Sequence, residues 1–275
     1  MNTAQIWMIT GAGRGLGRAL TMAALDAGHS VVATVRSSHS LPVHERLTVH
    51  HLDVRDRQGA FEAVADVVSR FGRLDVLVNN AGYGLISAVE EASEQDARDI
   101  VDTNLFGPLW LSQAAIPVMR DQGSGHIVQV STVGAVGTMP TLGLYNSAKW
   151  GLEGFSEALA GEVAQFGIRV TLAQPGAIAT EWGGDSMRFS QPSAAYDKLR
   201  TDLFGTATVP WPSSEAPADG TPAAEVAALI LAHVENQNDE RLRLLIGNDA
   251  PMQVAAALKL RLNDYGRDSR FHLSN

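Results

Sequence analysis

The sequence contains no cysteine, so disulfide bridges and thiolate chemistry are excluded. This absence fits a reducing compartment, and we expect a cytoplasmic protein. The chain also lacks an apolar run of the roughly 18 residues that a membrane span requires. Its N-terminal stretch, MNTAQIWMITG, has no basic flank before a long apolar core, which distinguishes it from a signal peptide. We therefore expect a soluble protein with no membrane contact.

Positive charge is scarce as well. There are 21 lysines and arginines against 30 acidic residues, and the formal net charge is -9. A protein that binds nucleic acid needs a basic face toward the phosphate backbone, so this function class is excluded. No metal site is expected, because cysteine is absent and the adjacent His50 and His51 would face opposite sides of a strand.

What the sequence does contain is a regular alternation of β-rich and helical segments. The expected strands are QIWMIT, SVVATV, LTVHHL, LDVLVN, HIVQVS, IRVTLA and LRLLIG. Several are apolar on both faces, as parallel strands covered by helices are. Helical patterns cover residues 16–27, 57–71, 96–120, 145–166, 223–235 and 251–262. The alternation predicts the α/β class, namely a doubly wound Rossmann-like fold whose seven-stranded, mainly parallel sheet is flanked by helices.

One long segment interrupts this alternation. Residues 183–222 are irregular, and their last part, GTATVPWPSSEAPADGTP, contains several prolines. A domain linker is one interpretation, but one strand and two helices are too little for a second core. Long loops within a compact domain are typically functional lids or disordered segments. We therefore expect a single domain over residues 1–275, with a substrate lid at 183–222 and a C-terminal tail at 248–275.

A glycine-rich turn follows the first expected strand in TGAGRGLGRAL. Taken alone, the glycines would indicate only a tight connection between a strand and a helix. Here, however, an apolar strand precedes the turn and an amphipathic helix follows it. Such a turn directs backbone N–H groups and the positive end of the helix toward an anion such as a pyrophosphate. The turn therefore favours nucleotide binding.

The spacing of Thr10, Gly11, Gly15 and Gly17 resembles the single-domain short-chain dehydrogenase/reductase family. Further motifs follow in the order of that family: LDV at 52–54, NNAG at 79–82, DTNLFG around Asn104, YNSAK at 145–149 and QPGAIAT at 174–180. The resemblance implies a nicotinamide cofactor, a small carbonyl or alcohol substrate, and a homodimer or homotetramer with interfaces near 103–121 and 144–166. The cofactor-binding residues that it implies are Gly11, Gly15, Leu16, Gly17, Asp53, Val54, Asn80, Ala81, Gly82, Tyr145, Lys149, Pro175, Gly176, Ile178 and Thr180.

The end of the second strand bears on the choice of dinucleotide. A cofactor without a 2′-phosphate is usually held there by a carboxylate, but Val35 takes that position and Arg36 follows it. A second arginine, Arg14, lies in the glycine-rich turn. Two cations and no acid suit a 2′-phosphate, although both arginines could also be solvated surface residues. We predict a preference for NADP(H), with NAD(H) possible.

Tyr145 and Lys149 are four residues apart, which places them on one face of a helix. Free tyrosine has a pKa of about 10 and is a poor acid at neutral pH, and a nearby ammonium is expected to lower that pKa. By itself the pair would indicate simple packing. The resemblance implies that Tyr145 is the general acid in reduction and the base in oxidation, and that Lys149 tunes it and binds ribose. By itself, Asn104 would be interpreted as a helix cap or a local turn residue. The resemblance implies instead that Asn104 holds a water molecule in a proton relay.

The substrate-orienting hydroxyl has two candidates in QVSTVGAVG, Ser131 and Thr132. The family usually has serine 13 residues before the tyrosine, and this position is Thr132. Ser131 would point to the opposite face if the strand continues. We predict Thr132 for this role and keep Ser131 as the alternative.

Several large side chains are candidates for the substrate pocket, although each could equally be ordinary packing. They suggest an apolar or aromatic substrate end. A nucleotide-sugar epimerase or dehydratase would need a different glycine spacing and a larger C-terminal domain, and a catalytically silent NADP-binding regulator would not need the tyrosine, lysine and asparagine. The sequence thus predicts an NADP(H)-dependent oxidoreductase that interconverts a ketone or aldehyde and an alcohol by hydride transfer. The candidate pocket residues are Tyr83, Met139, Leu144, Trp182 and Phe189, with Trp211 in the lid.

Overall fold

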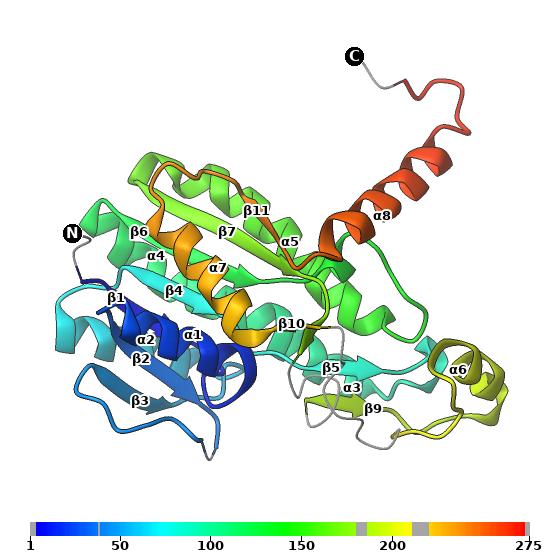
Figure 1. Cartoon of the computed structure of the whole chain (residues 1–275), viewed down its shortest axis with the longest axis horizontal. Helices are drawn as coiled ribbons and strands as arrows, with labels where there is room; N and C mark the ends of the chain where they lie inside the picture. Colours follow the sequence, from blue (N-terminus) through cyan, green and yellow to red (C-terminus); the bar gives the residue numbers. More distant parts are fainter. Residues whose placement is uncertain (1–3, 38, 180–185, 211–219, 273–275) are drawn as a thin grey trace.

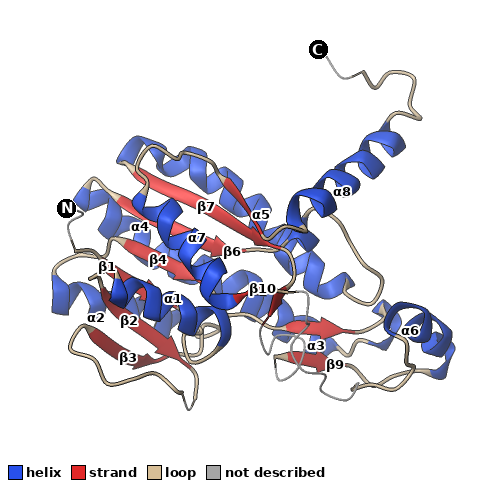
Figure 2. Ribbon diagram, in the orientation of Figure 1, coloured by secondary structure: helices blue, strands red, loops and turns tan. Residues whose placement is uncertain are grey.

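The structure is a computed structural model that describes residues 4–37, 39–179, 186–210 and 220–272. Its centre is a seven-stranded sheet in which every pair of neighbouring strands is parallel (Figures 1 and 2). The strand order is β3-β2-β1-β4-β6-β7-β11, which reverses between β1 and β4. The strands are β1 (Ile6–Ile9), β2 (Ser30–Val35), β3 (Leu47–His51), β4 (Val76–Asn79), β6 (Gly125–Val130), β7 (Ile168–Pro175) and β11 (Arg243–Ile246). The predicted doubly wound sheet is confirmed, and it is wholly parallel.

Helices cover both faces of the sheet, because its central strands direct apolar side chains to both sides. Trp7 and Ile9 of β1 belong to one buried cluster, while Met8 between them belongs to the other. The first cluster includes α1 (Gly15–Asp26) and α7 (Ala223–Glu235), and the second includes α2 (Arg57–Phe71), α4 (Gly107–Gln122) and α5 (Gly143–Val163). The two helix layers lie on opposite sides of the sheet in Figure 1.

The single helix expected over residues 96–120 is interrupted. The structure has α3 (Glu94–Val101), then a π-helical turn, η2 (Asp102–Phe106), and then α4. Ser93 caps α3 through a capping box with Asp96. A π-turn places one extra residue in the helix and often marks a functional site. Asn104 lies in this turn.

The segment expected to be a lid contains local structure. Its described residues form β9 (Met187–Phe189), η6 (Ala194–Tyr196) and α6 (Asp197–Phe204), and β9 pairs in parallel with β5 (Gly84–Ile86). Arg200 of α6 is buried and donates to Glu91 at 2.6 Å and to Asp197 at 2.8 Å. The segment is therefore held against the residues that precede α3. The remaining short elements are η1 (Val89–Glu91), η3 (Val133–Ala135), η4 (Ala164–Phe166), and the paired β8 (Ile178–Ala179) and β10 (Thr221–Pro222).

The last helix, α8 (Ala250–Tyr265), extends away from the body of the molecule (Figure 1). Its inner face packs on the loop after β6, where a Cβ on Gly137 would lie 3.1 Å from that of Ala257. Met252, Leu260 and Tyr265 are more than half exposed. Among the described residues, no helix is long and apolar enough to cross a lipid bilayer.

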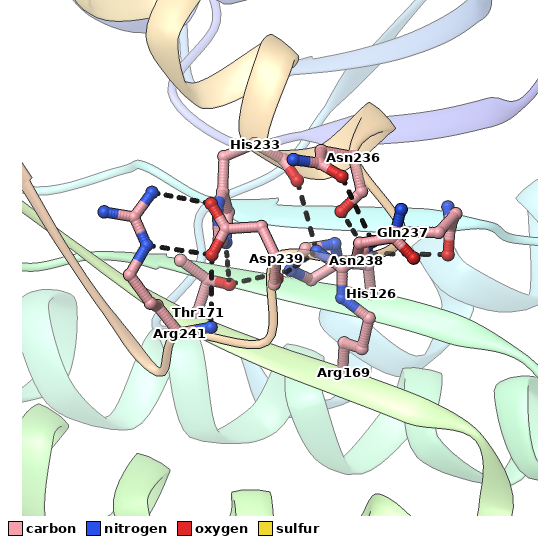
Figure 3. A network of polar contacts seen from close by, with 9 residues as sticks. All are labelled: His126, Arg169, Thr171, His233, Asn236, Gln237, Asn238, Asp239 and Arg241. Atoms are coloured by element: carbon pink, nitrogen blue, oxygen red, sulfur yellow. Dashed lines mark hydrogen bonds and ion pairs between the residues drawn. The ribbon is translucent and has the colours of Figure 1, made fainter.

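A chain of polar side chains ties α7 to the sheet (Figure 3). Thr171 Oγ1 lies 2.8 Å from His126 Nε2 and 2.9 Å from His233 Nε2. His233 Nδ1 lies 2.8 Å from Asp239 Oδ2, and Arg241 closes the chain with a 2.6 Å ion pair to Asp239. Burial lowers the pKa of His126 well below its ordinary value. This chain of contacts lies near the amino-terminal ends of β6 and β7.

Candidate active site

The glycine-rich turn lies at the carboxyl end of β1, beside the position where the strand order reverses. This is where open α/β sheets bind ligands. Gly11 and Gly15 have φ angles of +63° and +52°, which favour glycine. A Cβ on Gly11 would lie 2.9 Å from Cα of Ala81, and one on Gly17 would collide with the carbonyl oxygen of Gly11. The turn therefore needs these glycines to pack closely against NNAG.

Thr10 and Asn80 lock the turn to the segment after β4. The Thr10 hydroxyl oxygen accepts from the backbone N–H groups of Asn80 at 3.0 Å and Ala81 at 2.9 Å. The Asn80 amide donates in return to the carbonyl oxygen of Thr10 at 2.8 Å. Side chains thus satisfy backbone groups on both sides and hold the turn against the segment after β4.

The amino end of α1 fits a phosphate group. Arg14 is its N-cap and makes no side-chain capping bond, and no acidic residue lies in the first turn. The side chain of Leu16 belongs to the core, so only its backbone can face a cofactor. Unsatisfied N–H groups and the helix dipole at such an end favour an anion.

The end of β2, where the sequence predicts that the cofactor's ribose binds, carries positive charge. The Val35 side chain is buried, and the exposed Arg36 follows it. Arg36 is close enough to Asp53 to lower the pKa of that carboxyl group, although hydrogen bonds from Arg55 contribute most to this shift. Arg55 Nη2 donates to Asp53 Oδ2 at 2.6 Å. Val54 is buried against Gly107, where an added Cβ would lie 2.8 Å from Val54 Cγ2.

Asn104 holds the loop after NNAG in place. Its side chain donates to the carbonyl oxygen of Tyr83 at 2.9 Å and accepts from the backbone N–H of Tyr83 at 3.1 Å. A Cβ on Gly82 would lie 3.1 Å from Asn104 Oδ1 and 3.7 Å from Lys149 Nζ. Asn104 is fully buried. The π-turn therefore brings Asn104, Gly82 and Lys149 together, with the Asn104 amide bound to backbone.

Tyr145 hydrogen-bonds the side chain of Thr132. The Thr132 oxygen also accepts from the backbone N–H of Gly134 at 3.1 Å, which fixes its rotamer. The neighbouring Ser131 hydroxyl is buried and has no hydrogen-bond partner among the described residues. Burial raises the pKa of Tyr145 above its ordinary value, and the bond to Thr132 opposes this only in part. The lowering expected from a nearby ammonium is therefore wrong for this structure.

Lys149 is buried beneath the same site. Its Nζ donates to the carbonyl oxygen of Val130 at 2.7 Å. Burial lowers the pKa of Lys149 to about 8, while the charge of Glu153 acts in the opposite direction. Glu153 accepts from Gln174 at 2.9 Å and from Arg243 at 3.0 Å. The sequence did not single out Glu153, although its spacing of four residues from Lys149 was a signal.

The turn after β7 is also held by an acid that sequence reasoning missed. Asp249 Oδ2 accepts from the backbone N–H of Ala177 at 2.9 Å, and a Cβ on Gly176 would collide with this carboxylate. Asp249 follows the last strand of the sheet, so its role depends on the pairing of β11 with β7. Pro175 ends β7 and Ile178 begins β8. Thr180 and Trp182 lie outside the described residues, as does Trp211.

The candidate pocket residues lie on the side of β5 and β9. Tyr83 and Leu144 pack against the buried cluster of Leu85, Ile100 and Tyr145. Phe189 is half-buried on β9, while Met139 is 36% exposed on the loop before α5. The structure thus packs Tyr83 and Leu144 with the cluster that contains Tyr145, whereas that cluster does not include Phe189 or Met139.

A glycine-rich turn, the exposed Arg14 and Arg36, and the buried Tyr145 and Lys149 are thus gathered on a doubly wound sheet, as the class of dinucleotide-dependent oxidoreductases requires. A family model described as short chain dehydrogenase matches residues 5–189. The chain belongs to the short-chain dehydrogenase/reductase family and is an NAD(P)-dependent oxidoreductase.

Related proteins and structures extend over most of the chain. Oxidoreductase BOA17 of Botryotinia fuckeliana is 40% identical over 260 residues, which cover 90% of each chain. A 3-ketodihydrosphingosine reductase of Bacteroides thetaiotaomicron is 39% identical over 64% of this chain and 65% of its own. A short-chain dehydrogenase structure from Streptomyces avermitilis has a TM-score of 0.85 at 34% identity, covering 97% of this chain and 99% of the other. One from Burkholderia cenocepacia, in complex with NADP, has a TM-score of 0.73 at 25% identity and coverages of 96% and 97%.

Proposed function

We propose that the protein is an NADP(H)-dependent oxidoreductase that interconverts a ketone or aldehyde and an alcohol, with Tyr145 as the general acid and base. The observation that carries this proposal is the hydrogen bond between Thr132 and Tyr145, which lies one helical turn before the buried Lys149 on α5. These groups supply what carbonyl reduction needs besides hydride, namely a proton donor and an orienting hydroxyl.

The cofactor preference is supported by charge. Arg14 and Arg36 are both exposed at the ribose end, and no carboxylate ends β2. A guanidinium binds a phosphate with charge-assisted, often bidentate, hydrogen bonds. The NADP bound in the Burkholderia cenocepacia structure supports the same choice. Asp53 would hold the adenine end, and Gly11, Gly15 and Gly17 would face the pyrophosphate.

The protein's own groups manage the proton. A bound nicotinamide supplies or accepts the hydride. During reduction, the Thr132 hydroxyl orients the carbonyl oxygen and the Tyr145 phenol gives its proton to that oxygen. Burial raises the pKa of Tyr145, so the phenol carries its proton and the transfer depends on neighbouring groups that stabilise the phenolate. The Lys149 ammonium then stabilises the phenolate, and its proton exchanges near neutral pH because its pKa is about 8. Oxidation runs these transfers in reverse.

The substrate end that we propose is apolar or aromatic. Tyr83, Leu144 and Leu85 pack with Tyr145, and the charged side chain beside them is Arg188, whose guanidinium lies 4.5 Å from the centroid of the Tyr83 ring. The Bacteroides thetaiotaomicron relative is named a 3-ketodihydrosphingosine reductase, which supports a ketone as the substrate.

The test is turnover by the purified full-length chain. A panel of aliphatic ketones, aromatic ketones, aldehydes, steroids and quinones is assayed with NADPH and, separately, with NADH. We expect kcat/KM to be higher with NADPH and with apolar or aromatic carbonyls. Tyr145→Phe should lose about 100- to 10,000-fold in kcat while it still binds NADPH. Normal turnover by Tyr145→Phe would refute the mechanism, and a preference for NADH would refute the cofactor assignment.

We further propose a homodimer or homotetramer. The large exposed apolar residues of α8, including Met252, Leu260 and Tyr265, support an assembly that covers them. So does the position of Phe106 and Trp150, which are exposed near the helices implied as interfaces. Analytical ultracentrifugation of the full-length chain measures the state directly, and a monomer at micromolar concentration would contradict it.

A further inference from the structure

A chain of alternating charges runs from the cofactor end of the site to the substrate end. It begins at Asp53, where Arg55 Nη2 donates to Oδ2 at 2.6 Å. Arg55 Nη1 also donates to Asp99 Oδ1 at 3.2 Å. These contacts connect the loop after β3 to α3, although the two acids are far apart in the sequence.

Asp99 extends the chain to the substrate side. Its second oxygen, Oδ2, lies 3.6 Å from Arg188 Nη1 on β9. The Arg188 guanidinium carbon in turn lies 4.5 Å from the centroid of the Tyr83 ring, in cation–π contact. Asp99 is 19% exposed and is thus the most buried of the charged members. Both Arg55 and Arg188 form an ion pair with it.

The Tyr83 end of the chain reaches the catalytic groups. The Tyr83 ring packs against the cluster that contains Tyr145, and the Tyr83 backbone is held by Asn104. Any change in the position of Arg188 therefore acts on a wall of the substrate pocket. The pairing of β9 with β5 places Arg188 opposite Leu85 and so keeps the guanidinium over this wall.

We propose that Asp99 is a positioning residue that couples the adenine end of the cofactor site to the Tyr83 wall of the substrate pocket, through Arg55 and Arg188. The proposal rests on the proposed function, because it takes Asp53 as a cofactor contact. A cofactor that binds Asp53 changes the ion pair between Asp53 and Arg55, and therefore the ion pair between Arg55 and Asp99. The ion pair between Asp99 and Arg188 changes in turn, and the Tyr83 ring moves with the Arg188 guanidinium.

The direct test uses fluorine NMR of the full-length chain labelled with 3-fluorotyrosine. The sequence has four tyrosines, so four lines are expected, and Tyr83→Phe identifies one of them. The probe is adenosine 2′,5′-bisphosphate, which occupies the adenine end but carries no nicotinamide. We expect saturation with this probe to shift the Tyr83 line in the parent protein. The shift should be lost in Asp99→Asn and in Arg188→Gln, and Asp99→Glu should restore it.

A matched control lies on the same helix. Glu94→Gln removes one charge and one exposed ion pair, with Arg98, from α3. It should leave the shift of the Tyr83 line unchanged. Arg188 is 46% exposed, so Arg188→Gln is expected to fold even if Asp99→Asn does not.

Kinetics supply a second readout. With the carbonyl that the parent reduces fastest, Asp99→Asn should raise KM about two- to fivefold with little change in kcat, as expected for loss of a partly exposed ion pair.

The outcomes separate the coupling from the proposed function. If calorimetry shows that the bisphosphate binds but the Tyr83 line does not move, the coupling is refuted. A shift that persists in Asp99→Asn and Arg188→Gln refutes it as well. If no heat of binding is seen, the NADP(H) preference is refuted instead, and the same titration with 5′-AMP then tests the coupling. A chain that binds neither nucleotide contradicts both proposals.

Discussion

The phenol of Tyr145 is hydrogen-bonded to Thr132, the residue that replaces the serine usual in this family. The Thr132 oxygen is also anchored by the backbone N–H of Gly134 at 3.1 Å. The added methyl group is stiff, so one rotamer holds the hydroxyl toward Tyr145. Ser131, one residue earlier, is buried without a hydrogen-bond partner in the described part of the chain. Geometry thus favours Thr132 for the substrate-orienting role.

Replacing these two hydroxyls should have very different effects. Thr132→Ala is expected to lower kcat about 100- to 1000-fold, because it removes a preorganised donor to the developing oxyanion. Ser131→Ala should leave kcat nearly unchanged, and Thr132→Ser should retain activity. Steady-state kinetics with NADPH and one carbonyl measure all three variants, with thermal unfolding as the control for folding. A large loss for Ser131→Ala alone would assign the role to Ser131.

The pH dependence of reduction should report on Lys149. Burial lowers the pKa of this lysine to about 8, whereas burial raises the pKa of Tyr145. As the pH rises through about 8, the ammonium is lost while the phenol stays protonated, and kcat should fall. Lys149→Met should lower kcat across the whole pH range and should abolish the fall of kcat above a pH of about 8. Profiles of kcat between pH 6 and 10 would check this, and a profile that is flat across that range would argue against it.

The two arginines at the ribose end should control cofactor choice. Arg36→Ala is expected to lower kcat/KM for NADPH about 10- to 100-fold, because a charge-assisted hydrogen bond to phosphate is lost. The kcat/KM for NADH should change little. Arg14→Ala should likewise lower kcat/KM for NADPH. Arg267→Ala serves as the control, since that side chain is 84% exposed in the C-terminal tail. Equal losses of kcat/KM with NADPH and NADH would show that Arg36 does not recognise the 2′-phosphate.

The histidine chain of Figure 3 should make stability depend on pH. The folded state keeps His126 neutral because burial lowers its pKa, whereas the unfolded chain protonates near pH 6.5. The unfolded state therefore binds more protons below that pH. The free energy of unfolding should fall by up to about 1.4 kcal/mol per pH unit as the pH drops below 6.5, toward the folded-state pKa. The stability that depends on a neutral His126 is fully present above about pH 6.5.

Urea unfolding at pH 5 to 8 measures this dependence. His126→Gln keeps a donor toward Thr171 but does not titrate, so its stability should depend less on pH. His39→Gln, on the exposed loop after β2, is the control and should behave like the parent. Identical slopes for the parent and His126→Gln would exclude His126 as the source.

Much of the fold was readable from periodicity. Trp7, Met8 and Ile9 alternate between two helix-covered faces, and such strands must be apolar on both sides. The bounds of α2 and α7 match the helical patterns at 57–71 and 223–235. By contrast, β5 and β9 have three residues each, too few for a pattern, and they exist because they pair with each other. The π-turn at Asn104 was read as continuous helix, since its spacing resembles that of an α-helix.

In the candidate site, too, some residues could be predicted from the sequence and others could not. Glycines that need positive φ or close approach, such as Gly11 and Gly17, were recognisable in one short stretch. Asp249, Glu153 and Arg188 were not, because their partners are distant. Asp249 meets Ala177 only when β11 pairs with β7, and Arg188 meets Tyr83 only when β9 pairs with β5.

The sequence by itself determined the alternating parallel sheet, the phosphate turn and the helical spacing that puts Tyr145 and Lys149 on one face. These depend on local periodicity and on backbone sterics, which neighbouring residues set. Only the tertiary structure decided the protonation chemistry of that pair. The lysine charge alone predicts a lower pKa for Tyr145, yet burial among Leu85, Ile100 and Tyr83 raises it. Desolvation depends on what the rest of the chain places around a group, and no local spacing encodes it.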